Sequence, residues 1–184
     1  MFNSWVGVLI NSQASQAGPS NTTTETSVLP AAAKFTIPAN FFQNIGTVVR
    51  VTLCAAVSNV ASSPGTLNIK VKFGSNIAFD GGLQQLSTTV HTSLPFWWQA
   101  LLTVQVVGAS AAFKGQGVAM GQMCLRSGAD LATDGTEMSP NSAPANSATW
   151  DSTASQVMDL TATHSVSTAG TSTTSHQYVV EVLN

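Results

Sequence analysis

The feature that most constrains the fold is a long apolar segment at residues 96–107, which begins Phe-Trp-Trp and is closed by Gly108. At the two-residue period of a β-strand, one side is apolar throughout and consists of Trp98, Ala100, Leu102, Val104 and Val106. The other side is mixed and consists of Trp97, Gln99, Leu101, Thr103, Gln105 and Val107. This alternation predicts a long strand with one face in a core and the other in partly wet surroundings. We therefore expect it to be the central strand of a sandwich.

The chain is poor in charge, and this limits what its surface can do. Only 8% of its residues are charged, against about 25% in an average soluble domain. Ser, Thr, Asn and Gln supply much of the polarity instead, and the hydrophobic content of 43% is enough to build a core. Such a composition is untypical of metabolic enzymes. It is typical of all-β structural proteins whose surfaces are largely covered by neighbours.

Charge and hydropathy also bear on partners and location. The six basic residues are scattered and the net charge is −2, so we expect no nucleic-acid partner. No run of apolar residues approaches the 18 that a membrane span needs, so we expect no membrane partner. No basic residue precedes Lys34, unlike in a signal peptide, so we expect synthesis in the cytosol or transport inside a larger particle.

Further segments show strand periodicity, and none of any length shows the pattern of an amphipathic helix. In addition to the tryptophan segment, we expect strands at residues 34–37, 47–57, 67–73, 77–79, 113–125, 157–164 and 176–183. About eight strands separated by turn signals predict an all-β, antiparallel β-sandwich of the jelly-roll type. Three glycines, Gly115, Gly117 and Gly121, interrupt one of these strands, so we expect bulges or a close backbone approach there.

We expect a single domain at residues 28–184, preceded by an arm and linker at residues 1–27. The arm begins with apolar residues and continues, at 11–27, as a polar stretch without periodicity. Its apolar part either adds a strand to its own sheet or pairs with a neighbouring molecule. A long loop at 127–155 is rich in Ser, Ala, Asn, Asp and Pro and contains Trp150. Loops this long are usually functional or disordered.

No residue pattern points to catalysis, a metal or a cofactor. His91, His164 and His176 lie far apart, and no nucleophile elbow, phosphate-binding loop or dinucleotide fingerprint is present. His164 and His176 flank one predicted hairpin, but histidines near turns are common without a metal. The only cysteines, Cys54 and Cys124, belong to no metal or redox pair, so we expect free, partly buried thiols. We predict a non-enzymatic protein without cofactors.

A carbohydrate-binding module is the alternative from a different functional class. Trp97, on the mixed face of its strand, and Trp150, in the long loop, are candidates for stacking on sugar rings. The competing interpretation of Trp97 is burial against another subunit or against the arm, because exposed tryptophan on a sheet face is uncommon without a partner.

The order of several segments resembles small virion surface proteins of tailed bacteriophages, namely head decoration or cement proteins and related capsid or fibre-type jelly rolls. The residues that carry the resemblance are 46–51, 65–74, Pro95-Phe96-Trp97-Trp98, 108–110, 114–117, 159–163 and 180–184. It covers residues 46–184 apart from the long loop.

The resemblance implies a cement protein that binds the outer surface of a phage capsid, commonly as a homotrimer, and seals contacts between major capsid subunits. The expected location is the virion, after assembly in the host cytoplasm. We expect the contacts with the capsid or other subunits to involve Phe2, Trp5, Val8, Ile10, Trp97, Leu101, Val107 and Trp150. The alternatives are a receptor- or glycan-binding domain of a phage fibre or spike, and a tail component.

Overall fold

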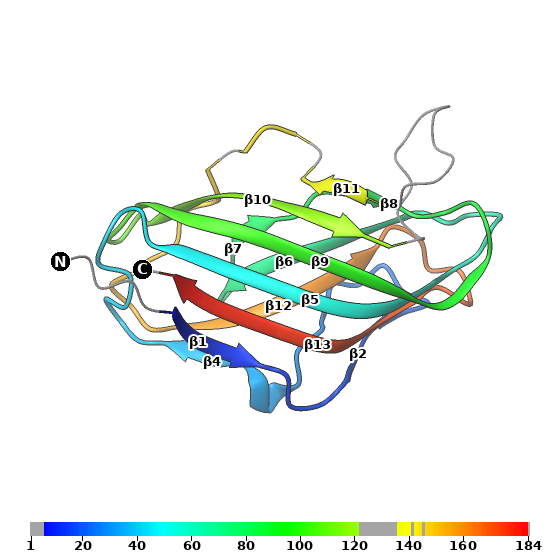
Figure 1. Cartoon of the computed structure of the whole chain (residues 1–184), viewed down its shortest axis with the longest axis horizontal. Coiled ribbons are helices and arrows are strands. Elements are labelled where there is room, and N and C mark those ends of the chain that lie inside the picture. Colours follow the sequence, from blue (N-terminus) through cyan, green and yellow to red (C-terminus); the bar gives the residue numbers. More distant parts are fainter. Residues whose placement is uncertain (1–5, 122–135, 141, 145, 184) are drawn as a thin grey trace.

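The computed structural model describes residues 6–121, 136–140, 142–144 and 146–183. Within these residues, thirteen strands form two antiparallel sheets that pack face to face (Figure 1). One 3-10 turn, η1 (Ala31–Ala33), is the sole helical element among them, and no helix there is long and apolar enough to cross a membrane. The predicted all-β sandwich is confirmed.

The first sheet, sheet A, has the strand order β1-β13-β5-β9-β10-β11, and β2 also pairs with β13. Its strands are β1 (Val6–Asn11), β2 (Gln16–Ser20), β5 (Val48–Asn59), β9 (His91–Val106), β10 (Ala112–Met120), β11 (Thr136–Ser139) and β13 (Ser172–Leu183). The second sheet, sheet B, has the order β3-β12-β6-β7, with β4 beside β12 and β8 beside β6. Its strands are β3 (Thr26–Ser27), β4 (Phe35–Ile37), β6 (Thr66–Phe73), β7 (Asn76–Asp80), β8 (Gln84–Gln85) and β12 (Gln156–His164).

The chain crosses repeatedly between the sheets. It passes from β5 in sheet A to β6 in sheet B, returns after β8 to β9, and crosses again on both sides of β12. As a result, β5 and β9 are neighbours although β6, β7 and β8 separate them in the sequence. These crossings are of the Greek-key kind and fit a jelly-roll-like sandwich.

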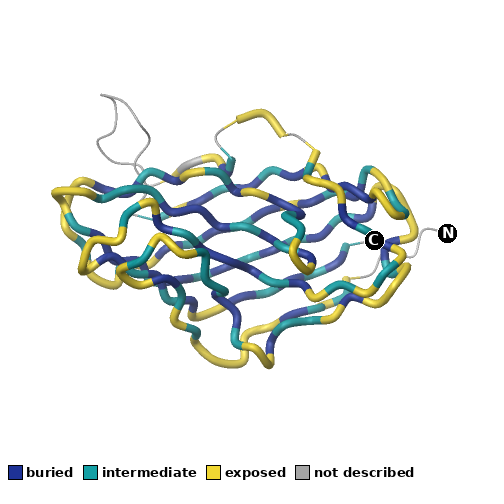
Figure 2. Tube along the Cα trace, turned by 180° about the vertical axis from the view of Figure 1, so that it is seen from behind, coloured by how far each residue is buried: buried dark blue, intermediate teal, exposed yellow. Residues whose placement is uncertain are grey.

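The core lies between the sheets, and the predicted inward faces are largely confirmed. Alternate residues of β5, β6 and β9 are buried, as the period-two patterns predict. Seen from behind, exposed positions gather on loops and at the ends of the sandwich, while the strands are mostly buried or half-buried (Figure 2).

Val106 differs from the prediction and is 41% exposed. The cause is a break in register, because Ala112 pairs with Val106 whereas Phe113 pairs with Val104. Gln105 is therefore an extra residue in β9, and such a bulge reverses the alternation beyond it. The apolar side of the tryptophan strand ends at Val104.

The N-terminal arm belongs to the sandwich in the residues that the structure describes. Strand β1 pairs with β13, so the apolar arm adds a strand to its own sheet, one of the two expected alternatives. The expected linker at 11–27 is corrected, because β2 joins sheet A and β3 joins sheet B. Ladder hydrogen bonds come from the backbone, so a polar sequence without alternation still forms short edge strands. Phe2 and Trp5 lie outside the described residues.

The long loop predicted at 127–155 contains paired segments in its second half. Strand β11 pairs with the end of β10, and single bridges join Lys114 to Asn146 and Ala111 to Trp150. This pairing turns Trp150 inward, where it is 3% exposed and packs on Phe73 and Phe113 with ring centroids 4.7 and 5.5 Å away. The prediction that Trp150 is a surface contact or sugar-stacking residue is therefore wrong. Residues 127–135 lie outside the described part of the chain.

Candidate functional site

The outer face of sheet A is the surface that the sequence pointed to. Strand register aligns its outward residues in rows across the sheet, and residues in a row are close enough for their side chains to interact. One row contains Met120, Trp97, Cys54 and Gln177, and the next contains Val118, Gln99, Thr52 and Val179. The third contains Gln116, Leu101, Arg50, Glu181 and Val8, and the fourth contains Lys114, Thr103, Val48, Leu183 and Val6.

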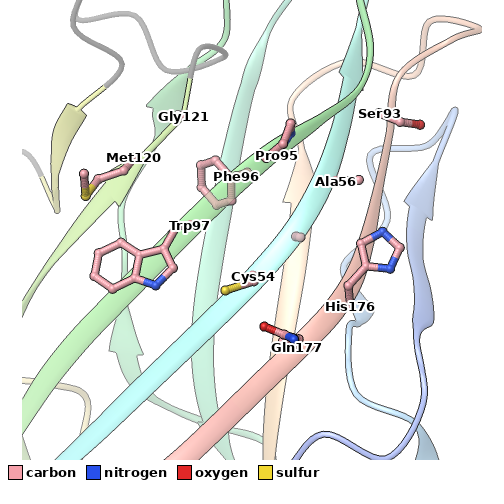
Figure 3. A pocket seen from close by; sticks show the side chains of 11 residues that line it. Cys54, Ala56, Ser93, Pro95, Phe96, Trp97, Met120, Gly121, His176 and Gln177 are labelled. Atoms are coloured by element: carbon pink, nitrogen blue, oxygen red, sulfur yellow. The ribbon is translucent and has the colours of Figure 1, made fainter.

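A groove of about 640 Å³ lies over the first row, and we call it the Trp97 groove. Its lining includes Cys54, Ser93, Trp97, Met120, His176 and Gln177, contributed by strands β5, β9, β10 and β13 (Figure 3). Trp97 is half-buried, between Met120 on β10 and Cys54 on β5. The floor is largely apolar, with polar groups among the residues around it.

Two strand irregularities supply those polar groups. On β13 the register shifts between Ser175 and Gln177, so that His176 and Gln177 are both exposed instead of alternating. On β9 two residues oppose Ser58 of β5, and Ser93 takes a positive φ of 53° while its N–H donates to the Ser58 Oγ at 2.9 Å. Bulges commonly re-aim side chains in this way beside binding sites.

Gly121 lets β10 end close against β9 at the border of the groove. Its φ is +153°, and a Cβ there would lie 2.7 Å from the carbonyl oxygen of Pro95. Gly115 and Gly117 show the same crowding, with nearest atoms at 2.5 and 2.3 Å from such a Cβ. The predicted close backbone approach is confirmed at Gly117 and Gly121, whereas the side chains of Phe79 and Leu102 crowd Gly115.

Among the described residues, the lining of the groove contains no Lys, Arg, Asp or Glu. Burial raises the pKa of the Cys54 thiol, which therefore stays protonated at neutral pH. The Nδ1 of His176 lies 3.0 Å from the Ser15 Oγ. In the described residues, no group of three His, Cys, Asp or Glu side chains lies close enough to hold a metal ion. The groove offers one aromatic surface and several uncharged hydrogen-bonding groups.

The other end of the same face carries apolar side chains that we call the valine patch: Val6, Val8 and Leu101, which are exposed, and Val48 and Leu183, which are half-buried. Val6 and Val8 are 58% and 56% exposed, and Leu101 is 47% exposed. Within these rows, the Nε of Arg50 donates to the Oε2 of Glu181 at 2.7 Å, so the two charges there neutralise each other.

The structure places some of the predicted contact residues on one outer face and others in the core. Val8, Trp97 and Leu101 lie on the outer face of sheet A, at an exposed or half-buried position. Ile10 is only 2% exposed and belongs to the core with Trp150, so neither side chain offers a contact surface. Ile10 is buried while Val8 is exposed because the register of the β1–β13 pairing shifts between these two residues. The remaining predicted residue, Val107, is half-buried against the core.

Sequence reasoning missed Val6, Val48 and Leu183 of the valine patch and Met120, His176 and Gln177 of the groove. Alternation in each strand predicts which residues face outward, but only the register shows which of them become neighbours. The exposure of His176 beside Gln177 depends on a bulge that no local pattern announces.

No protein-family model and no curated protein matches the sequence. Among solved structures, the chain is similar to the CBM2 module of the evolved Dit of Lactobacillus casei BL23 phage J-1, with a TM-score of 0.36 and 11% identity. The alignment covers 92% of this chain and 76% of that chain. A likeness at this level carries no argument about function.

Proposed function

We propose that the chain is a non-enzymatic structural protein of a virion, which docks through the valine patch on a neighbouring protein subunit of the capsid. The observation that carries the proposal is the gathering of exposed Val6, Val8 and Leu101 at one end of one sheet face. Apolar patches of this kind mark interaction surfaces, because their exposure to water is unfavourable.

The electrostatics of the patch favour a protein partner over a nucleic acid. The guanidinium of Arg50 is already paired with Glu181, which leaves Lys114 as the one unpaired cation in these two rows of described residues. A nucleic acid would require several cations free to meet phosphates. An apolar centre depleted of unpaired charge is typical of the core of a protein–protein interface.

The composition of the chain supports placing that interface in a virion. Only 8% of the residues are charged, which suits a subunit whose surfaces are largely covered by neighbours. The resemblance of residues 46–184 to decoration and cement proteins points to the exterior of a capsid and to a homotrimer. Many copies, each with a modest patch, would hold to a particle through multivalency.

The test is co-sedimentation with capsids that were assembled without the chain, from the phage whose genome encodes it. Leu101→Asn should weaken capsid binding more than tenfold, because burying a leucine contributes about 1.5–3 kcal/mol. The matched control is Val157→Asn, at a residue of β12 in sheet B that is 43% exposed, and it should leave binding unchanged. Normal binding by Leu101→Asn, or a loss with Val157→Asn alone, would contradict the proposal.

The glycan-binding alternative loses one of its two candidate residues, because Trp150 is in the core. Trp97 remains, in a groove whose chemistry is distinct from that of the valine patch.

A further inference from the structure

We propose that the Trp97 groove is a binding site for a neutral saccharide. This goes beyond the docking function and does not rest on it, because the groove and the valine patch involve different rows of the sheet. Trp97 and Leu101 lie four residues apart on β9, or about 14 Å at the rise of a β-strand. The groove therefore has its own ligand and its own test.

Trp97 supplies the aromatic surface. The other tryptophans in the described part of the chain, Trp98 and Trp150, are buried, so Trp97 alone among them reaches the surface. Met120 and Cys54 are its cross-strand neighbours on either side. An indole held in this way offers a rigid apolar face with little conformational entropy to lose, which suits stacking against the C–H face of a sugar ring.

Polar groups elsewhere along the groove match the hydroxyl groups of a sugar. Gln177 has an amide that both donates and accepts, and no partner in the described residues occupies its exposed side chain. Ser93 contributes a hydroxyl and His176 a ring nitrogen beyond the one facing Ser15. A sugar hydroxyl also donates and accepts, so these groups can satisfy it in either role.

The charge and size of the groove exclude other ligand classes. A phosphate, a carboxylate or an ammonium group would lose water without meeting a Lys, Arg, Asp or Glu among the described lining residues. A purely apolar ligand would leave Gln177 and Ser93 without partners. The volume of about 640 Å³ lies within the range of small-molecule sites, roughly 300–1,000 Å³. A neutral ligand with an apolar face and a hydroxyl rim fits all three observations.

The experiment is a glycan array that carries neutral hexose and N-acetylhexosamine oligosaccharides beside sialylated and sulfated ones, followed by calorimetric titration of the strongest neutral binder. Trp97→Ala should weaken binding at least tenfold, and Trp97→Phe should weaken it less, because a ring for stacking remains. Gln177→Ala, at an exposed position, should weaken binding about threefold to tenfold through the loss of one hydrogen bond. Leu101→Asn is the matched control and should bind as the original chain does.

Three outcomes would overturn the proposal: no neutral oligosaccharide bound at millimolar concentration, binding restricted to acidic glycans, or binding unaffected by both Trp97→Ala and Gln177→Ala. Unfolding midpoints of the variants separate loss of binding from loss of fold. If Trp97→Ala unfolds, Trp97→Phe and Gln177→Ala decide the question together, and unchanged binding in both contradicts the site.

Discussion

The indole Nε1 of Trp98 donates a hydrogen bond to the Oγ of Ser139 at 2.8 Å, deep between the sheets. The same hydroxyl donates to the carbonyl oxygen of Gly81 at 2.7 Å. Trp98 belongs to the central strand β9 and Ser139 to β11, while Gly81 follows the last residue of β7 in sheet B. One buried hydroxyl therefore satisfies two polar groups and ties the two sheets together.

Ser139→Ala should lower the free energy of unfolding by about 1–3 kcal/mol, because the Trp98 N–H would be buried without a partner, whereas the Gly81 carbonyl keeps the hydrogen bond from the Gln84 Nε2. Urea unfolding followed by circular dichroism measures the change. Ser142→Ala, at an exposed serine, is the control and should change stability by less than about 0.5 kcal/mol. Equal stability of the two variants would show that the Ser139 hydroxyl has no structural role.

Gly115→Ala should destabilise the chain by about 1–3 kcal/mol through overpacking. A Cβ at Gly115 would lie 2.5 Å from the Phe79 ring and 2.6 Å from Leu102 Cδ2. Adding Phe79→Leu removes part of the obstruction, so the double variant should be more stable than the sum of the two single effects predicts. Strict additivity in urea unfolding would argue against contact between these positions.

Stability should fall in acid because of His164. This side chain is buried, its Nε2 lies 2.9 Å from the Thr173 Oγ1, and burial lowers its pKa to about 4. Its Nδ1 has no hydrogen-bond partner among the described residues.

In the unfolded chain His164 takes up a proton near its usual pKa of about 6.5, whereas the folded state resists protonation down to about 4. The contribution of neutral His164 to the free energy of unfolding is therefore complete above about pH 6.5. It declines as the pH falls toward 4, by up to about 3 kcal/mol. Urea unfolding at pH 7.5, 6.0 and 5.0 measures the slope. In the variant His164→Asn, the free energy of unfolding should change less with pH across this window. A pH dependence as steep as that of the original chain would assign the effect to other groups.

The Cys54 thiol should react slowly with iodoacetamide, because burial raises its pKa and the thiolate is the reactive species. The measurement uses a Cys124→Ser background at pH 8, with mass spectrometry to follow the alkylation of Cys54. The rate should be well below that of free glutathione and should approach it in urea. A folded-state rate equal to that of glutathione would contradict the burial of this thiol.

Much of the fold was predictable, because period-two alternation is a direct consequence of strand geometry. The eight expected strands all form in the described residues, which leave out 122–125 of the strand expected at 113–125. The inward residues of β5, such as Val49 and Leu53, are buried as predicted. What escaped prediction depends on pairing between distant segments. The bridge between Ala111 and Trp150 and the pairing of β1 with β13 involve residues whose local sequence shows no sign of the partner.

The candidate site was predictable in part for the same reason. Alternation alone puts Trp97 and Leu101 on the outer face of sheet A. One bulge turns Val106 to the outer face, and another exposes both His176 and Gln177. Each comes from a single extra residue, which sequence patterns do not reveal. Lys70 and Lys72 both bond to Glu25, a residue of the segment expected as a linker, at 3.2 and 2.6 Å, and the sequence shows no sign of this pairing.

The most direct test of the docking function is an electron cryo-microscopy reconstruction of virions whose genome encodes this chain. We expect density for the sandwich on the capsid exterior, with the valine patch around Val8 and Leu101 buried against another protein subunit. Density for the chain with that end of sheet A facing solvent, or no copy of the chain on the particle, would contradict it.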